Sequence, residues 1–264
     1  MADYGDDLGL ALELGDLADA ITLERYLATD LVVDTKPDLT PVTEADRAVE
    51  QAVRERLASV RPGDSVLGEE YGTSTVQDGT RRWIIDPIDG TKNYVRGIPV
   101  WATLLALEKQ GRIVLGVVSA PALGRRWWAA RGAGAFVADG LGERQRPLKV
   151  SAVRDLADAQ LCVSGFDGWI EAGSLEAMLE LSRRCWRTRG FGDFWGYMLV
   201  AEGAAEINVE AAVSLWDLAA PMAIVEEAGG RFTDLAGEPT ANGGDALATN
   251  AHVHAAALAI VGRS

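Results

Sequence analysis

The feature that most constrains this chain is a short apolar run, residues 82–85, that leads directly into Asp-Pro-Ile-Asp-Gly-Thr at 86–91. The run predicts a buried strand. Two carboxylates three residues apart across a proline-constrained turn can converge on one point, where Gly90 and Thr91 also offer backbone N–H groups. Carboxylates bind hard metal ions, and N–H groups bind phosphate oxygens. An ordinary Asp-rich turn before a capped helix has the same pattern, so this segment alone does not decide between the two.

Two further acidic motifs favour a metal site. Glu69 and Glu70 follow an apolar stretch, and one of them can serve as a ligand, although adjacent glutamates are usually a solvated surface pair. Asp217 follows a tryptophan at an expected helix start, where a plain N-cap is the alternative. Joined to Asp86 and Asp89, these side chains form an oxygen-rich ligand set, which suits magnesium or manganese better than zinc.

The three motifs together carry a resemblance. GEE at 68–70, DPIDGT at 86–91 and WDLAAP at 216–221 resemble, in order and spacing, the inositol monophosphatase family of metal-dependent phosphatases. The resemblance extends from the first expected helix to the glycine pair at 229–230, which is nearly the whole chain. It implies an α+β fold, a layered α/β/α/β/α sandwich, and a phosphomonoester hydrolase that uses metal-activated water.

The family pattern also implies a ligand set. Glu69 and Asp86, with the backbone carbonyl of Ile88, resemble the ligands of the tightest metal. Asp86, Asp89 and Asp217 resemble the carboxylates around a second metal, and a third, weaker one would be held through Glu69 and water. The resemblance therefore implies up to three magnesium ions per site, with manganese as an alternative.

Further positions resemble the family's reactive groups. Thr91 and Glu69 match the pair that orients the attacking water, and Asp46 matches the aspartate that hydrogen-bonds the threonine. The N–H groups of Gly90 and Thr91 match the phosphate cradle. Asp46 also follows a candidate N-cap, Thr43, at the spacing of a capping box.

Two acidic residues are candidates for substrate binding. Asp193, after a glycine at an expected helix start, and Glu210 match family positions that contact the substrate. The alternatives are a helix N-cap for Asp193 and a surface loop acid for Glu210. Two carboxylates opposite the metals would suit a cationic leaving group, and histidinol phosphate carries an amine and an imidazole.

Longer stretches bear on the substrate as well. Residues 34–47, 91–101 and 120–128 resemble the histidinol-phosphate phosphatases of the actinobacterial type within this family. We therefore expect a histidinol-phosphate phosphatase of histidine biosynthesis. Inositol 1-phosphate or a broad range of sugar phosphates is the alternative, and a non-catalytic metal-binding regulatory protein is a more distant one. The segment 125–128, Arg-Arg-Trp-Trp, is either a hairpin with solvated arginines and packed tryptophans or a contact over the site or between subunits.

Composition excludes several classes. The 264-residue chain has 39 acidic and 25 basic side chains, and its net charge of −14 argues against nucleic-acid or anionic-membrane binding. No apolar run approaches the ~18 residues of a membrane span, and residues 1–7 lack the basic region of a signal peptide, so we expect a cytoplasmic protein. The only histidines, His252 and His254, lie near the C-terminus, which disfavours histidine-based chemistry. The resemblance implies a homodimer.

The order of expected elements is mixed rather than regularly alternating, which favours stacked sheets and helices over a doubly wound fold. We expect two halves: residues 1–150 with most of the metal ligands, and residues 151–264 with Asp217 and the substrate contacts. Helices are expected at 8–28, 41–57, 175–186, 194–202, 217–228 and 255–261. Strands are expected at 82–85, 103–107, 113–118, 160–164, 206–209 and 246–249, with a hairpin at 127–137.

Overall fold

The computed structural model describes residues 4–37, 39–74, 80–140 and 144–263. Within these ranges the first half of the chain forms an eight-stranded sheet with the strand order β10-β9-β8-β7-β6-β5-β3-β4. The strands are β3 (Ser65–Gly68), β4 (Gly72–Ser74), β5 (Arg81–Asp89), β6 (Ala102–Lys109), β7 (Arg112–Ala120), β8 (Arg125–Ala130), β9 (Gly134–Asp139) and β10 (Arg144–Pro147). Neighbouring strands are antiparallel except β3 and β5, which are parallel.

The second half forms a smaller, five-stranded sheet with the order β12-β11-β13-β15-β14. Its strands are β11 (Gln160–Cys162), β12 (Arg187–Arg189), β13 (Ile207–Glu210), β14 (Arg231–Thr233) and β15 (Ala246–Thr249). The helices of the chain are α1 (Gly5–Arg25), α2 (Glu44–Val60), α3 (Thr91–Val95), α4 (Asp167–Glu171), α5 (Leu175–Arg184), α6 (Asp193–Ala201), α7 (Leu215–Glu227) and α8 (His254–Val261), with 3₁₀ turns at Pro121–Leu123 and Leu156–Asp158.

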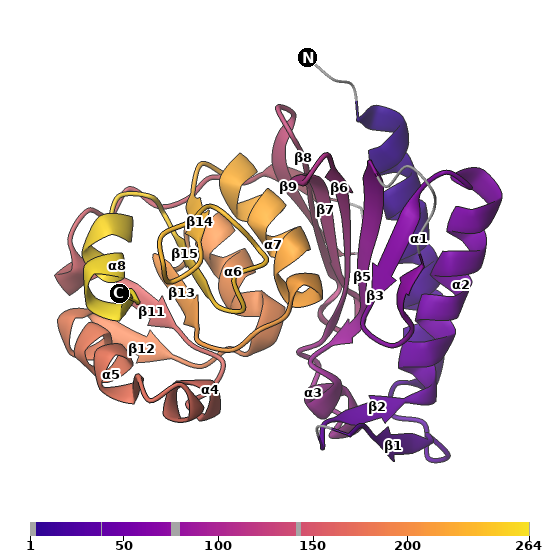
Figure 1. Cartoon of the computed structure of the whole chain (residues 1–264), viewed down its shortest axis with the longest axis horizontal. Coiled ribbons are helices and arrows are strands. Elements are labelled where there is room, and N and C mark those ends of the chain that lie inside the picture. Colours follow the sequence, from indigo (N-terminus) through magenta and orange to yellow (C-terminus); the bar gives the residue numbers. More distant parts are fainter. Residues whose placement is uncertain (1–3, 38, 75–79, 141–143, 264) are drawn as a thin grey trace.

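These elements stack in five layers, which confirms the expected α/β/α/β/α sandwich. Helices α1 and α2 cover the outer face of the large sheet, α6 and α7 lie between the two sheets, and α4, α5 and α8 cover the far face of the small sheet (Figure 1). No helix in the described part of the chain is both long and apolar enough to cross a membrane.

Three large apolar clusters separate these layers. One packs α1 and α2 on the large sheet, a second packs α6 and α7 between the sheets, and a third packs α5 and α8 on the small sheet. The middle cluster draws side chains from both halves. Because the two sheets share this core, the structure does not separate the halves 1–150 and 151–264, and that division stays a prediction.

The expected elements are present, but their ends differ from the predicted bounds. The helix expected from Pro41 begins instead at Glu44, because Pro41–Thr43 forms strand β2, which pairs with β1 (Val33–Thr35) as a hairpin. The capping box of Thr43 and Asp46 is confirmed. Position 38 of the stretch 34–47 and the first three residues of the segment 1–7 lie outside the described residues.

The hairpin interpretation of 125–128 is confirmed for its tryptophans but not for its arginines. Trp127 and Trp128 are buried. Arg125 pairs with Asp139 and Glu202, and Arg126 pairs with two aspartates of α1, so neither guanidinium is simply solvated. These bonds fasten β8 to α1 and α6 at a distance from the acidic motifs.

Helix α7 lies very close to the large sheet because Gly116 of β7 has no side chain. A β-carbon at this position would lie 2.5 Å from the carbonyl oxygen of Ala220 and 2.9 Å from its Cα. This contact with backbone atoms cannot be relieved by a rotamer change. Gly116 therefore sets how closely α7 packs against the large sheet. Asp217 lies in the first turn of this helix, so its position depends on the same contact.

We predict that Gly116→Ala destabilises the protein by about 1–3 kcal/mol, because overpacking forces α7 away from the sheet. Gly9→Ala is the matched control. Gly9 is exposed inside α1, and no atom beyond its chain neighbours and the backbone of its own helix lies within 4 Å of the methyl group that alanine would add, so this change should stabilise by about 0.5–1 kcal/mol. Urea unfolding measures both changes, and equal stability of the two variants would contradict this account of α7 packing.

Candidate metal centre and active site

The centre of the site lies where strand β5 ends. Strands β3 and β5 are parallel, with Gly68 opposite Ile85, so the next residues, Glu69 and Asp86, emerge side by side. The pairing of β5 with β6 shifts register between Asp86 and Asp89. Strand β5 thus continues to Asp89, where a turn after residue 85 was expected, and the irregularity brings both aspartates to the same edge of the sheet. Asp86 is almost fully buried, at 1% exposure.

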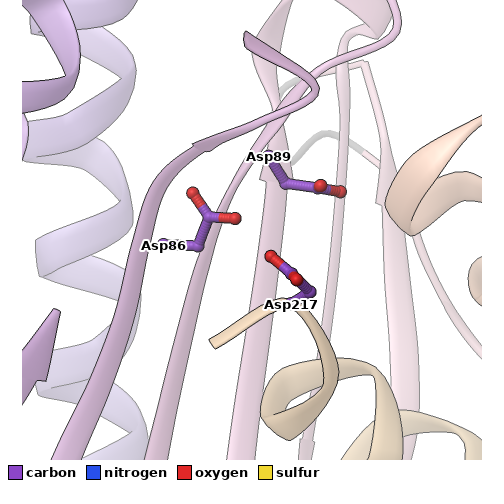
Figure 2. A group of neighbouring side chains, drawn as sticks. All are labelled: Asp86, Asp89 and Asp217. Atoms are coloured by element: carbon purple, nitrogen blue, oxygen red, sulfur yellow. The ribbon is translucent and has the colours of Figure 1, made fainter. Parts of the chain in front are cut away.

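Helix α7 supplies the third carboxylate from the other half of the chain. Ser214 is its N-cap, and the Oδ2 atom of Asp217 accepts the N–H of Ser214 at 2.8 Å in a capping box. Asp217 is therefore the third helical residue and not the N-cap itself. Carboxylate oxygens of Asp86, Asp89 and Asp217 lie within 4.8 Å of one another, and the three side chains gather beside the start of α7 (Figure 2).

This grouping is electrostatically unfavourable without a cation. Burial, followed by the negative charges of Glu69, Asp89 and Asp217, raises the pKa of Asp86 well above its usual value. Burial also raises the pKa of Asp89 strongly, with the charge of Asp193 as the next cause. The pKa of Asp217 rises to about 6, again chiefly through burial. Converging carboxylates of this kind, one buried and two half-buried, fit a divalent ion with oxygen ligands.

Glu69 lies beside this trio but is paired elsewhere. Its N–H donates to the carbonyl of Ile85 at 3.2 Å, which continues the β3–β5 ladder. Its Oε1 atom lies 2.6 Å from Nζ of Lys36, which also contacts Glu70 at 2.5 Å. Burial lowers the pKa of Lys36, but the bonds to the two glutamates outweigh this and raise it.

The other expected reactive groups meet at the start of α3. The hydroxyl of Thr91 donates to the carbonyl of Ile88 at 2.9 Å and lies 3.3 Å from Oδ1 of Asp46. The second oxygen of Asp46 accepts the N–H and hydroxyl of Thr43. Burial raises the pKa of Asp46 to about 6. Gly90 has a φ of 82°, the left-handed conformation that glycine adopts without strain, at the turn from strand to helix.

The two expected substrate residues line the same cavity as the acidic motifs. A cavity of about 770 Å³ is bordered by Glu69, Asp89, Asp193, Glu210 and Asp217, among others. Neither alternative for the substrate pair holds, because Gly192 is the N-cap of α6 and Glu210 ends strand β13.

The start of α6 is tied directly to the DPID segment. The N–H of Phe194 donates to Oδ2 of Asp89 at 2.6 Å, and the side-chain amide of Asn93 donates to Oδ2 of Asp193 at 3.0 Å. Asp193 has a φ of 44°, which is uncommon for a residue with a side chain. These bonds fix Asp193 at the wall of the cavity, next to the carboxylate trio.

The carboxylate of Glu210 is held in place by the hydroxyl group of a buried tyrosine. Tyr197 donates to its Oε2 atom at 2.6 Å, and the ring of Tyr197 stacks on Phe232. Burial raises the pKa of Glu210 to about 7, although bonds from Ser164 and Tyr197 oppose the rise.

Sequence reasoning did not identify several residues that hold this site. Lys36, Glu50, Asn93, Ser164 and Tyr197 all bond to the candidate residues or to their backbone. Only Lys36 carried a usable signal, because a lysine in a turn before the first acidic motif can pair with it. The others act across 13 to 100 positions of sequence, which no local pattern reveals.

Comparison with known proteins identifies the class. The profile of the inositol monophosphatase family matches residues 10–262. The chain belongs to this family and is a metal-dependent phosphatase that acts on phosphate monoesters. The resemblance inferred from the three acidic motifs is thus confirmed, and the interpretation as a non-catalytic protein loses its support.

Individual members of the family are similar to this chain over nearly its whole length. The chain is 57% identical to a histidinol-phosphatase of Mycobacterium tuberculosis over 94% of this chain and 95% of the relative. It is 55% identical to a histidinol-phosphatase of Streptomyces coelicolor over 96% of each. Among solved structures, the extragenic suppressor protein SuhB of Bartonella henselae superposes with a TM-score of 0.88 at 29% identity, over 97% of this chain and 98% of that one.

We predict that Asp217→Asn stabilises the EDTA-treated protein relative to the wild type at neutral pH. Asp217 has a pKa of about 6 when folded and near 3.8 when unfolded, so the folded state holds its proton more tightly. The ionised side chain therefore costs stability above pH 6, and asparagine removes that cost. Urea unfolding at pH 4 and pH 7 should show the variant gaining roughly 1–2 kcal/mol on the wild type as the pH rises. Parallel pH curves for the two proteins would contradict the electrostatic account.

Proposed function

We propose that this protein is a magnesium-dependent histidinol-phosphatase, which hydrolyses histidinol phosphate to histidinol and phosphate in histidine biosynthesis. The observation that supports this substrate is the pair Asp193 and Glu210, which borders the same cavity as Asp89 and Asp217. The two relatives above, which share more than half of their residues with this chain and are histidinol-phosphatases, support it.

The donor set supports magnesium, with manganese as an alternative. Asp86, Asp89 and Asp217 would hold the ions together with Glu69 and the carbonyl of Ile88, in up to three positions. All of these donors are oxygens, which hard divalent cations prefer. When bound, such ions supply positive charge against the phosphate dianion and lower the pKa of water.

The chain's own groups position the reactants. We assign to Glu69 and Thr91 the orientation of the attacking water, and to Asp46 the orientation of the Thr91 hydroxyl, which it approaches at 3.3 Å. The N–H groups of Gly90 and Thr91 lie at a helix start, where backbone donors have no acceptor within the helix and can bind phosphate oxygens. Positioning and charge neutralisation then account for most of the catalysis.

The leaving group would face Asp193 and Glu210. Histidinol carries an amine and an imidazole, and a buried carboxylate bonds a cation more strongly than it bonds a hydroxyl. Tyr197 and Asn93 keep the two carboxylates in place before the substrate arrives. The resemblance to the family also leads us to propose a homodimer in the cytoplasm.

The first test compares substrates. With magnesium, we expect phosphate release from histidinol phosphate to exceed release from inositol 1-phosphate at least tenfold in kcat/KM, and EDTA to abolish both. Glu210→Gln should lose most of that preference by raising KM for histidinol phosphate, because the neutral amide no longer pairs with a cation. A wild-type preference for inositol 1-phosphate would refute the substrate and leave the metal site intact.

The second test addresses the metal site. Asp89→Asn keeps the size of the side chain and an acceptor for the N–H of Phe194, but it removes one negative charge from the trio. We expect turnover to fall on the order of 100-fold or more with the fold retained by circular dichroism. Wild-type activity in this variant would show that the proposed ligand set is wrong.

A further inference from the structure

A second buried carboxylate lies one helical turn beyond Asp46. Glu50 of α2 is 0% exposed, and it is not part of the proposed ligand set. Residues four apart lie on the same face of a helix, so Glu50 and Asp46 both point from α2 toward the ends of β3 and β5. A fully buried carboxylate requires specific partners, because burial without them is strongly unfavourable.

The partners of Glu50 are backbone N–H groups next to Glu69. Its Oε2 atom accepts the N–H of Glu70 at 2.7 Å, and its Oε1 atom accepts the N–H of Tyr71 at 3.1 Å. Arg54 donates to the same Oε1 at 2.8 Å and also reaches the carbonyl of Gly72. Glu50 therefore holds the turn between β3 and β4, from which the Glu69 side chain projects.

A glycine makes room for this arrangement. A β-carbon on Gly68 would overlap the carboxylate of Glu50, which passes directly over the backbone before Glu69. The motif that begins at Gly68 thus has two parts: a glutamate facing the cavity, and a glycine that admits Glu50 from behind.

One helix therefore positions both groups that we assign to the attacking water. Asp46 reaches the hydroxyl of Thr91, and Glu50 holds the backbone that carries Glu69. We infer that Glu50 is a positioning residue for this reaction: it fixes Glu69 for metal binding through the N–H groups of Glu70 and Tyr71. This inference rests on the proposed function, because it takes Glu69 as a ligand.

A purely structural role for Glu50 would have a different signature. A buried ion pair with Arg54 contributes little net stability in general, and its loss would appear in unfolding experiments alone. A positioning role must appear in metal affinity, because partners that orient a ligand typically change affinity 10–100-fold.

The test is Glu50→Gln, which keeps the shape of the side chain but leaves one N–H of the turn without an acceptor. Mn²⁺ binding to EDTA-treated, dialysed protein is measured by electron paramagnetic resonance of the free ion. We expect the Kd for Mn²⁺ to rise about tenfold and kcat to fall about tenfold at saturating Mg²⁺, with KM for the phosphate ester within twofold of the wild type. Glu55→Gln, on the exposed face of the same helix, is the matched control and should change neither value.

Gly68→Ala disturbs the same contact by displacing the Glu50 carboxylate, and it should also raise the Kd for Mn²⁺. This variant provides the test if Glu50→Gln does not fold. Wild-type Kd and kcat in a folded Glu50→Gln, whatever its stability, would overturn the inference. Asp89→Asn distinguishes a failure of the proposed metal site from a failure of the role assigned to Glu50. If that variant binds Mn²⁺ normally and turns over, the proposed metal site fails; if it is inactive while Glu50→Gln is normal, only the role of Glu50 fails.

Discussion

The mutual repulsion of three clustered aspartates, Asp86 buried and the other two half-buried, is the constraint on which the rest of this structure depends. Asp86, Asp89 and Asp217 converge within 4.8 Å although burial and their neighbours raise the pKa of each. The surrounding elements oppose this cost with directed donors: the N–H of Phe194 for Asp89 and the N–H of Ser214 for Asp217. The clustered carboxylates lower the stability of the fold, but their oxygens are already positioned to bind a cation.

Whether a feature of the fold or the site could be predicted from the sequence depends on how far apart in the sequence its residues lie. The capping box of Thr43 depends on neighbouring residues and is correct in the sequence-based prediction. The turn expected at 86–89 was wrong, because these residues form the last part of strand β5, with an irregularity in the pairing with β6. The hairpin β1–β2 was missed because two three-residue strands produce no periodic pattern. The start of α7 was placed two residues late, because Asp217 is itself a good capping residue and conceals Ser214.

The contacts that orient the site lie beyond local reasoning. Glu50 and Glu70 are twenty positions apart, and Asn93 and Asp193 a hundred. Such residues meet only through tertiary packing, of α2 on the large sheet and of the start of α6 beside the end of β5. The acidic residues themselves were identifiable because a familiar motif marks them, whereas their supporting partners carry no mark of their own.

The placement of Asp217 on α7 also has a consequence for synthesis on the ribosome. Asp86 and Asp89 leave the ribosome long before α7, the helix that completes their cluster. Until α7 packs against Gly116, the unfinished sheet presents a pair of carboxylates and an uncovered apolar face. The three-aspartate cluster is therefore complete only after α7 has been made and both parts of the polypeptide have joined.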